Sequence, residues 1–121
     1  MDAKEIKARI KWYHEEVVNK GNIAVVDEFL APNYSGLDML TGQKWGIDDM
    51  KQSYSQMIAA FSEGQFSIGD IVVEDDRAAF RWVATVKDQQ GKLSTRAGFS
   101  MYTFVDGKVA EDYFIGGEVK T

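Results

Sequence analysis

The sequence contains no cysteine, a single histidine (His14) and a single proline (Pro32) among its 121 residues. Without thiols it can form neither disulfides, nor thiolate metal sites, nor a cysteine nucleophile, and one imidazole cannot build a multi-histidine metal centre. It also lacks Gly-rich phosphate loops and the Gly-x-Ser-x-Gly, His-Glu-x-x-His and calcium-loop motifs. We therefore expect no metal, nucleotide, flavin or other cofactor.

Basic charge and long apolar runs are also scarce. The chain has 14 Lys and Arg against 19 Asp and Glu, a formal net charge of −5, so it lacks the basic character that nucleic acid or an anionic membrane would require of a partner. No apolar run approaches the roughly 20 residues that span a bilayer, and the first 20 residues alternate charged with apolar positions, which predicts neither a signal peptide nor an anchor. The missing cysteines agree with a cytoplasmic location.

What remains is an ordinary globular composition, 45% hydrophobic and 27% charged. A chain of this length buries enough surface for one core, and no repeat or linker divides it, so we expect one domain over residues 1–121. The first half predicts helices over 2–20, over 22–30 and from Gly46 or Ile47 onward, with a short extended segment at 34–38. Five residues at helical spacing mark the inward face of the first helix: Ile6, Ile10, Tyr13, His14 and Val17.

Past Gly64 the apolar period changes from helical to alternating, which predicts four strands over 65–74, 77–87, 93–104 and 109–116. Their short connections indicate an antiparallel meander. In the second strand Phe80, Trp82, Ala84 and Val86 alternate with charged residues and should face the interior. We therefore predict an α+β fold, in which three helices pack on a strongly curved, mostly antiparallel sheet and leave a cavity between the layers.

Four stretches resemble one known family: WYHEEVVNKGN (12–22), DEFLAPNY (27–34), IVVEDDRAAFRW (71–82) and YTFVDGKVAE (102–111). In this order and spacing they are similar to the SnoaL-like polyketide cyclases of the nuclear transport factor 2-like superfamily. The resemblance spans nearly the whole chain and implies a cone-shaped α+β fold. That fold hosts cyclases, isomerases, hydrolases, hydroxylases and plain binding domains, so it implies much less about the chemistry.

The chain departs from the cyclase-like pattern at several positions. Ser100 stands where many members carry a histidine, Asp112 and Tyr113 replace a His-Trp pair, and Gly117 replaces an aspartate. Residues 111–114 also resemble the end of the limonene epoxide hydrolases, but the catalytic Arg and Asp of those enzymes fall at Trp82 and Ala84 here. Ketosteroid isomerases are similar at greater distance. The epoxide hydrolase triad is therefore not expected.

Asp112 is the leading candidate for catalysis. It shares its strand face with Ala110 and Phe114, so its carboxylate should lie on an apolar inward face, where desolvation raises the pKa and suits it to acid/base work. Alternatively, Asp112 lies with Glu111 on an exposed rim, or it only accepts hydrogen bonds from a loop. His14, on the inward stripe of the first helix, is the second candidate because it could relay a proton or bind a ligand oxygen. Its alternative is a helix-surface or core-edge position.

Six further residues are candidates for substrate binding. Tyr34 and Asp38 share one face of an extended segment, and Asp38 would supply a second carboxylate unless the segment is a solvated loop. Tyr54, Trp82 and Phe114 would form aromatic walls for a flat apolar ligand. Ser100 could donate a hydrogen bond to a carbonyl.

These residues favour a cofactor-independent acid/base enzyme that isomerises or cyclises a small apolar carbonyl or polycyclic compound. One alternative is a non-catalytic module on the same fold that binds a small ligand or dimerises, and a weaker one is an Asp-assisted hydrolase. Because Val109, Tyr113 and Ile115 should face away from Asp112, on the outer face of the sheet, we also expect a homodimer through that face.

Overall fold

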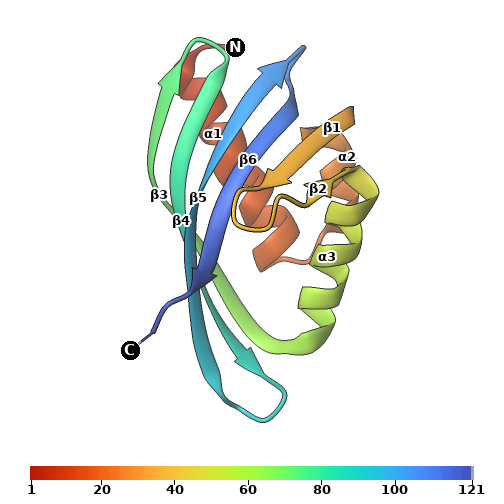
Figure 1. Ribbon diagram of the computed structural model, residues 1–121, viewed down its shortest axis with the longest axis vertical. Coiled ribbons are helices and arrows are strands. Elements are labelled where there is room, and N and C mark those ends of the chain that lie inside the picture. Colours follow the sequence, from red (N-terminus) through yellow and green to blue (C-terminus); the bar gives the residue numbers. More distant parts are fainter. Residues whose placement is uncertain (121) are drawn as a thin grey trace.

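A six-stranded sheet curves around the helices in the computed structural model, which describes residues 1–120 (Figure 1). Thr121, the last residue of the expected domain, lies outside the described residues. The helical elements are α1 (Ala3–His14), its π-helical extension η1 (Glu15–Asn19), the 3₁₀ turn η2 (Ile23–Val25), α2 (Val26–Phe29) and α3 (Ile47–Ala60). The strands are β1 (Leu30–Asp38), β2 (Lys44–Trp45), β3 (Phe61–Glu74), β4 (Arg77–Asp88), β5 (Leu93–Val105) and β6 (Lys108–Glu118).

The strand order is β2-β1-β6-β5-β4-β3, and every neighbouring pair is antiparallel except β1 and β6, which are parallel. The α+β class and the helices packed on a curved, mostly antiparallel sheet are therefore confirmed. The sequence pattern predicted β3 to β6 but not that 34–38 is part of a strand in the same sheet. β1 adds to β6 in parallel because η1, η2 and α2 return the chain across the inner face before it enters the sheet. Within residues 1–120 no helix is both long and apolar enough to cross a bilayer.

Helix α1 forms the centre of the core on the concave side of the sheet. Asp2 caps it by accepting a 2.8 Å hydrogen bond from the backbone N–H of Glu5. The expected apolar stripe is buried, with Ile6, Ile10 and Val17 each at most 1% exposed. Burial of each such side chain stabilises the folded state by about 2 kcal/mol, so packing rather than helix propensity accounts for most of the stability of α1.

Helix α3 differs from α1, because none of its residues is fully buried. Its first turn is fixed by the Asp49 carboxylate, which accepts a 2.8 Å hydrogen bond from the N–H of Gly46. The helix then passes directly into β3 at Phe61, four residues before the expected strand start at 65, because Gly64 pairs with Val86 inside the sheet instead of breaking the chain. Helix α3 therefore closes the concave side of the sheet and leaves space beneath it.

One expectation about β6 is wrong: Val109 does not face outward but is fully buried in the core. The register between β5 and β6 shifts between Thr103, which pairs with Glu111, and Phe104, which pairs with Val109. Ala110 is the extra residue of this β-bulge, so the inward and outward positions exchange there. Beyond the bulge Asp112 is buried, while Tyr113 and Ile115 remain exposed as expected.

The inward alternation of β4 is confirmed, and one of its residues depends on glycines in the neighbouring strands. Trp82 pairs with Gly98 of β5, which in turn pairs with Gly116 of β6. A methyl group on either glycine would lie 2.6 Å from the Trp82 ring. The indole therefore covers both glycines and forms a flat wall on the inner face of the sheet.

Candidate active site

A cavity of about 220 Å³ lies between α1, α3 and the inner face of the sheet. We call it the inner cavity. Its walls are mainly aromatic and apolar, and the side chains that matter most for its chemistry are His14, Tyr54, Phe66, Trp82, Tyr102 and Asp112. The residues come from α1, α3 and four strands, so only the tertiary fold assembles them.

Asp112 is the ionisable carboxylate of the inner cavity, and its side chain is almost fully buried. Its Oδ2 accepts a 2.7 Å hydrogen bond from the hydroxyl of Tyr34. Its Oδ1 is also buried but has no hydrogen-bond partner among the described residues. Burial raises the pKa of Asp112 from 3.8 to about 7, although the bond from Tyr34 opposes that rise by stabilising the charged form. One carboxylate oxygen is thus fixed and the other is left for a ligand.

The position of Tyr34 follows from the parallel pairing of β1 with β6. Gly36 of β1 pairs with Asp112, and Tyr34 lies two residues earlier on the same face. A Cβ atom on Gly36 would lie 2.5 Å from the Tyr34 hydroxyl oxygen. Because Gly36 has no side chain, the Tyr34 ring can reach across it to the carboxylate.

His14 is also buried in the cavity wall, but as a neutral hydrogen-bond acceptor. Its Nδ1 lies 2.8 Å from the carbonyl oxygen of Ile10, which can only accept, so Nδ1 carries the proton. Burial lowers the pKa of His14 from 6.5 to about 4, and the bond to Ile10 only partly offsets that effect. At neutral pH Nε2 therefore accepts the hydrogen bond from the Tyr102 hydroxyl, 3.2 Å away. This arrangement holds Tyr102 in place and leaves His14 without a proton for the cavity.

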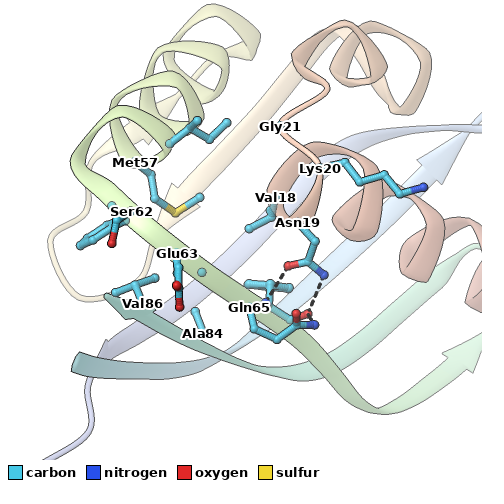
Figure 2. Close-up of a pocket in the computed structure, with 14 residues that line it drawn as sticks. Val18, Asn19, Lys20, Gly21, Met57, Ser62, Glu63, Gln65, Ala84 and Val86 are labelled. Atoms are coloured by element: carbon cyan, nitrogen blue, oxygen red, sulfur yellow. Dashed lines mark hydrogen bonds between the residues drawn. The ribbon is translucent and has the colours of Figure 1, made fainter. Parts of the chain in front are cut away.

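A stack of flat rings separates the inner cavity from its surroundings. Phe66 lies parallel to His14, with ring centroids 4.9 Å apart, and is also stacked on Trp82 at 5.6 Å. Its backbone is fixed by Asn19, whose side-chain amide accepts from the Phe66 N–H at 2.8 Å and donates to the Phe66 carbonyl at 3.1 Å (Figure 2). Asn19 thus replaces a strand partner at the edge of the sheet and positions the Phe66 ring.

Phe66 and Val18 also belong to the wall of a second cavity of about 220 Å³, which we call the outer cavity. Figure 2 shows it between η1, the end of α3 and strands β3 and β4, where its lining includes the apolar side chains of Met57 and Val86 and the polar side chains of Asn19 and Glu63. The side chains of Phe66 and Val18 therefore form a common wall between the two cavities. The lining of the outer cavity is the more polar of the two.

Tyr54 projects from α3 into the inner cavity. Its hydroxyl accepts a 3.1 Å hydrogen bond from Tyr13, and its own proton has no acceptor within residues 1–120. Burial raises the pKa of Tyr54 to about 12, and the charge of Asp112 adds to that rise while the Tyr13 bond opposes it. Tyr54 is therefore a neutral phenol throughout the physiological range, with a proton to donate.

The structure brings most of the predicted site residues together. Asp112, His14, Tyr54, Trp82, Ser100 and Phe114 all line the inner cavity. Tyr34 reaches it through its bond to Asp112. Asp38 is not brought to the cavity, because its carboxylate accepts hydrogen bonds from the N–H groups of Leu40 and Thr41 at 2.9 and 3.3 Å and closes the turn after β1.

Three aromatic wall residues were not among the expected site residues. They are Trp45, Phe66 and Tyr102. Tyr102 shares its strand face with Ser100 and could have been found by that alternation. Phe66 is anchored by a contact with Asn19 across 47 residues of chain, which no local pattern reveals. No cluster of three or more potential metal ligands occurs in the part of the chain that the structure describes.

The helices and the curved sheet define an α+β fold with a buried carboxylate in an aromatic cavity, and comparison with known proteins identifies the family of this fold. A family model described as the SnoaL-like domain matches residues 10–112, most of the chain. The protein therefore belongs to the SnoaL-like domain family, and its fold is that of the nuclear transport factor 2-like superfamily. None of the curated proteins matches the chain.

Solved structures with the same fold share little sequence with this chain. A candidate polyketide cyclase from Acidithiobacillus ferrooxidans has 22% identity and a TM-score of 0.78, with 96% of this chain and 91% of that chain covered. AclR, a candidate hydroxylase from Streptomyces galilaeus, has 21% identity and a TM-score of 0.82, with 96% and 81% covered. IdmH, a candidate polyketide cyclase from Streptomyces antibioticus, has 20% identity and a TM-score of 0.74, with 85% and 86% covered. At this identity the likeness establishes the fold alone.

Proposed function

We propose that the protein is a cofactor-independent acid/base enzyme that acts on a small apolar carbonyl or polycyclic compound, by isomerisation or aldol-type cyclisation. The observation that carries this proposal is the buried Oδ1 of Asp112, which has no partner among the described residues and belongs to a side chain of the inner cavity. A buried carboxylate oxygen without a hydrogen-bond partner is costly, and carboxylates with a pKa shifted by burial concentrate at functional sites. The SnoaL-like family membership supports the same class of chemistry.

The first step requires one base and one hydrogen-bond donor. Ionised Asp112 removes a proton from the carbon next to a ketone carbonyl, and the electron pair of the broken C–H bond moves to the carbonyl oxygen to give an enolate. With a pKa of about 7, Asp112 is both a usable base and, once protonated, a usable acid at neutral pH. It can then return the proton to a different carbon, or the enolate can attack a second carbonyl of the same molecule.

Proton exchange tests this step without knowledge of the natural substrate. We expect the wild-type protein to accelerate the exchange of the α-hydrogens of 1-tetralone for deuterium in D₂O, followed by NMR. Asp112→Asn keeps the shape of the side chain and should reduce the rate by at least 100-fold, since general-base catalysis contributes about 10²–10⁴-fold. Asp38→Asn is the matched control, because Asp38 bonds to the turn after β1, and it should exchange at the wild-type rate.

An Asp112→Asn protein that exchanges as fast as wild type contradicts the role of Asp112. A wild-type protein that binds the ketone but never accelerates exchange supports the binding-module alternative instead. Hydrolysis by an Asp-activated water would also leave the α-hydrogens in place, so the absence of exchange contradicts the proposed acid/base step in either case.

We also propose that the protein is a homodimer through the outer face of the sheet. Phe99 of β5 is 62% exposed and pairs with Ile115 of β6, and Val83 and Tyr113 are exposed nearby on the same face. These side chains form an apolar patch on one face of three neighbouring strands, beside Arg81, which pairs with Phe99. Exposed apolar patches mark interaction surfaces. A second copy of the chain offers the same patch, which a two-fold axis can bury against itself.

A further inference from the structure

We propose that the indole N–H of Trp45 is the hydrogen-bond donor to the carbonyl oxygen of the ligand in the inner cavity, which makes the ligand an aromatic ketone or a related polycyclic carbonyl compound. This inference rests on the proposed function, because it assigns the oxygen-binding group of the site in which Asp112 is the base. Trp45 was not among the residues that the sequence pattern assigned to the site. Its role follows from its position in β2 and from an unmade hydrogen bond.

The unmade bond is at Nε1 of Trp45. This atom is buried and has no partner among residues 1–120, and Trp45 lines the inner cavity. A buried N–H group without a partner costs about 1–3 kcal/mol, so it is rarely retained without a use. Asp112 Oδ1 is the one other atom of this cavity with the same property. The inner cavity thus has one donor atom and one acceptor atom that are fully buried and make no hydrogen bond within the described residues.

The sheet places these two groups on either side of one glycine. Gly36 of β1 pairs with Trp45 of β2 on one side and with Asp112 of β6 on the other. Trp45 and Asp112 therefore flank Gly36 on the inner face, where the Tyr34 and Phe114 rings pack over the glycine. The Trp45 ring packs edge to face against Phe114, with centroids 6.2 Å apart, which fixes the indole at the cavity wall.

The other polar groups of the wall are less suited to bind a carbonyl oxygen. The Tyr102 hydroxyl donates its proton to His14, so it presents only lone pairs. Tyr34 donates to Asp112 and has no second proton. Tyr54 retains a proton to donate, but Tyr13 holds its oxygen, and it projects from α3 rather than from the row of strands that contains Asp112. The hydroxyls of Ser53 and Ser100 also line the cavity, but neither is a fully buried group without a hydrogen-bond partner. The indole N–H of Trp45 is the donor that is both buried and unpaired within the described residues, in register with the base.

This arrangement sets the chemical class of the ligand. An indole N–H donates only, so its partner must accept, as a ketone oxygen does. When Asp112 removes an α-hydrogen the ketone oxygen becomes negative, and a donor already in place stabilises that charge. The surrounding aromatic walls require a flat apolar body of about two fused rings for a cavity of about 220 Å³.

The test compares 1-tetralone with tetralin, the same two-ring compound without the oxygen. Wild-type protein should bind 1-tetralone about tenfold more tightly than tetralin, measured by calorimetry or by protein NMR. Trp45→Phe keeps an aromatic ring but removes the N–H, and it should lose that preference while binding tetralin within about twofold of wild type. Trp12→Phe is the matched control, because Trp12 is exposed on α1 and does not line the cavity.

A second readout needs no variant to fold well. The chain has three tryptophans, so its ¹H–¹⁵N spectrum contains three indole N–H signals. The Trp45 signal should move downfield when 1-tetralone binds and should not do so with tetralin. Trp45→Phe protein that still prefers 1-tetralone, or a Trp45 signal that does not distinguish the two compounds, overturns the proposal.

The outcomes separate this inference from the proposed function. Asp112→Asn should keep the tenfold preference for 1-tetralone and lose α-hydrogen exchange. If Trp45→Phe keeps the preference and Asp112→Asn still abolishes exchange, the Trp45 assignment is wrong and the proposed function stands. If Trp45→Phe loses the preference but wild type shows no exchange, the Trp45 assignment stands and the proposed acid/base function is wrong. Wild-type protein that binds neither compound contradicts the ketone class itself.

Discussion

The hydroxyl of Tyr34 donates a 2.7 Å hydrogen bond to Oδ2 of Asp112, from a residue 78 positions earlier in the chain. The contact joins the parallel strands β1 and β6 and selects which oxygen of the carboxylate is left for chemistry. It also opposes the rise in the pKa of Asp112 that burial causes. Tyr34 is therefore a positioning residue for the proposed base.

Removing this bond should move the pH profile of α-hydrogen exchange. In wild type we expect the rate to rise with pH through a midpoint near 7, where Asp112 becomes ionised. Tyr34→Phe should shift that midpoint upward by about one unit, since a hydrogen bond to a charged group contributes about 1.5–3 kcal/mol and one pKa unit is 1.36 kcal/mol. The control is Tyr113→Phe, which lies on the outer face of β6, next to Asp112 in the sequence, and should keep the wild-type midpoint. An unmoved midpoint in Tyr34→Phe would show that the bond does not govern ionisation.

His14 should remain neutral over the range in which an ordinary histidine titrates. Its pKa is lowered from 6.5 to about 4 by burial, and its Nδ1 donates to the carbonyl of Ile10. Because it is the only histidine, one set of imidazole signals reports it without ambiguity. ¹⁵N NMR should show Nδ1 protonated and Nε2 unprotonated at pH 7, with no titration near 6.5. A midpoint near 6.5 would contradict the neutral acceptor role.

Asp112 should make the protein less stable as pH rises. In the unfolded chain its proton leaves near pH 3.8, whereas in the folded protein it is kept until about 7. Between these values the folded state binds more protons, so the free energy of unfolding falls with increasing pH. His14 acts in the opposite direction between about 6.5 and 4, because the unfolded state binds the additional proton there.

The Asp112→Asn variant isolates the carboxylate contribution. Because His14 is present in both proteins, the difference in unfolding free energy between variant and wild type reports Asp112. That difference should increase in favour of the variant by about 2.5 kcal/mol from pH 5 to pH 8, measured by urea unfolding. A difference that does not depend on pH would mean that Asp112 is not desolvated.

Because Trp82 packs against Gly98, an alanine at position 98 should destabilise the protein much more than an alanine at Gly117 of the adjacent strand. Gly98→Ala places a methyl group against the carbonyl oxygen of Ile115 and 2.6 Å from the Trp82 ring, so it should reduce the free energy of unfolding by about 2 kcal/mol or more. Gly117→Ala, where a Cβ meets no atom within 4 Å, should change it by less than about 0.5 kcal/mol. Thermal unfolding of both variants checks the contrast, and equal losses would contradict it.

The dimer proposal predicts a mass of about twice 13.6 kDa in solution at micromolar concentration. Phe99→Lys should convert the dimer to monomer, because it places a charge at the centre of the apolar patch on the outer face. Leu40→Lys is the control, since Leu40 is equally exposed but lies in the turn after β1. Analytical ultracentrifugation distinguishes the states, and a monomeric wild type would refute the proposal.

Local patterns were enough to predict a large part of this fold. The helical stripe of α1, the start of α3 and the alternation of β4 are all as expected, because each depends on spacing within one element. The inward position of Asp112 was also expected from strand parity. Yet that parity fails three residues earlier at Val109, because the bulge at Ala110 depends on how β5 and β6 pair and not on either sequence alone.

Composition and spacing predict the α+β class, the inward stripe of α1 and the restriction to carboxylate chemistry, since the residues needed for thiol or multi-histidine sites are absent from the chain. The environment of each candidate group depends instead on contacts between distant segments. The carboxylate of Asp112 is desolvated and held by Tyr34, the imidazole of His14 is committed to Ile10 and Tyr102, and Asp38 closes a turn. Spacing along the chain fixes which face a side chain occupies, but hydrogen-bond partners and burial depend on strands and helices that meet across the fold.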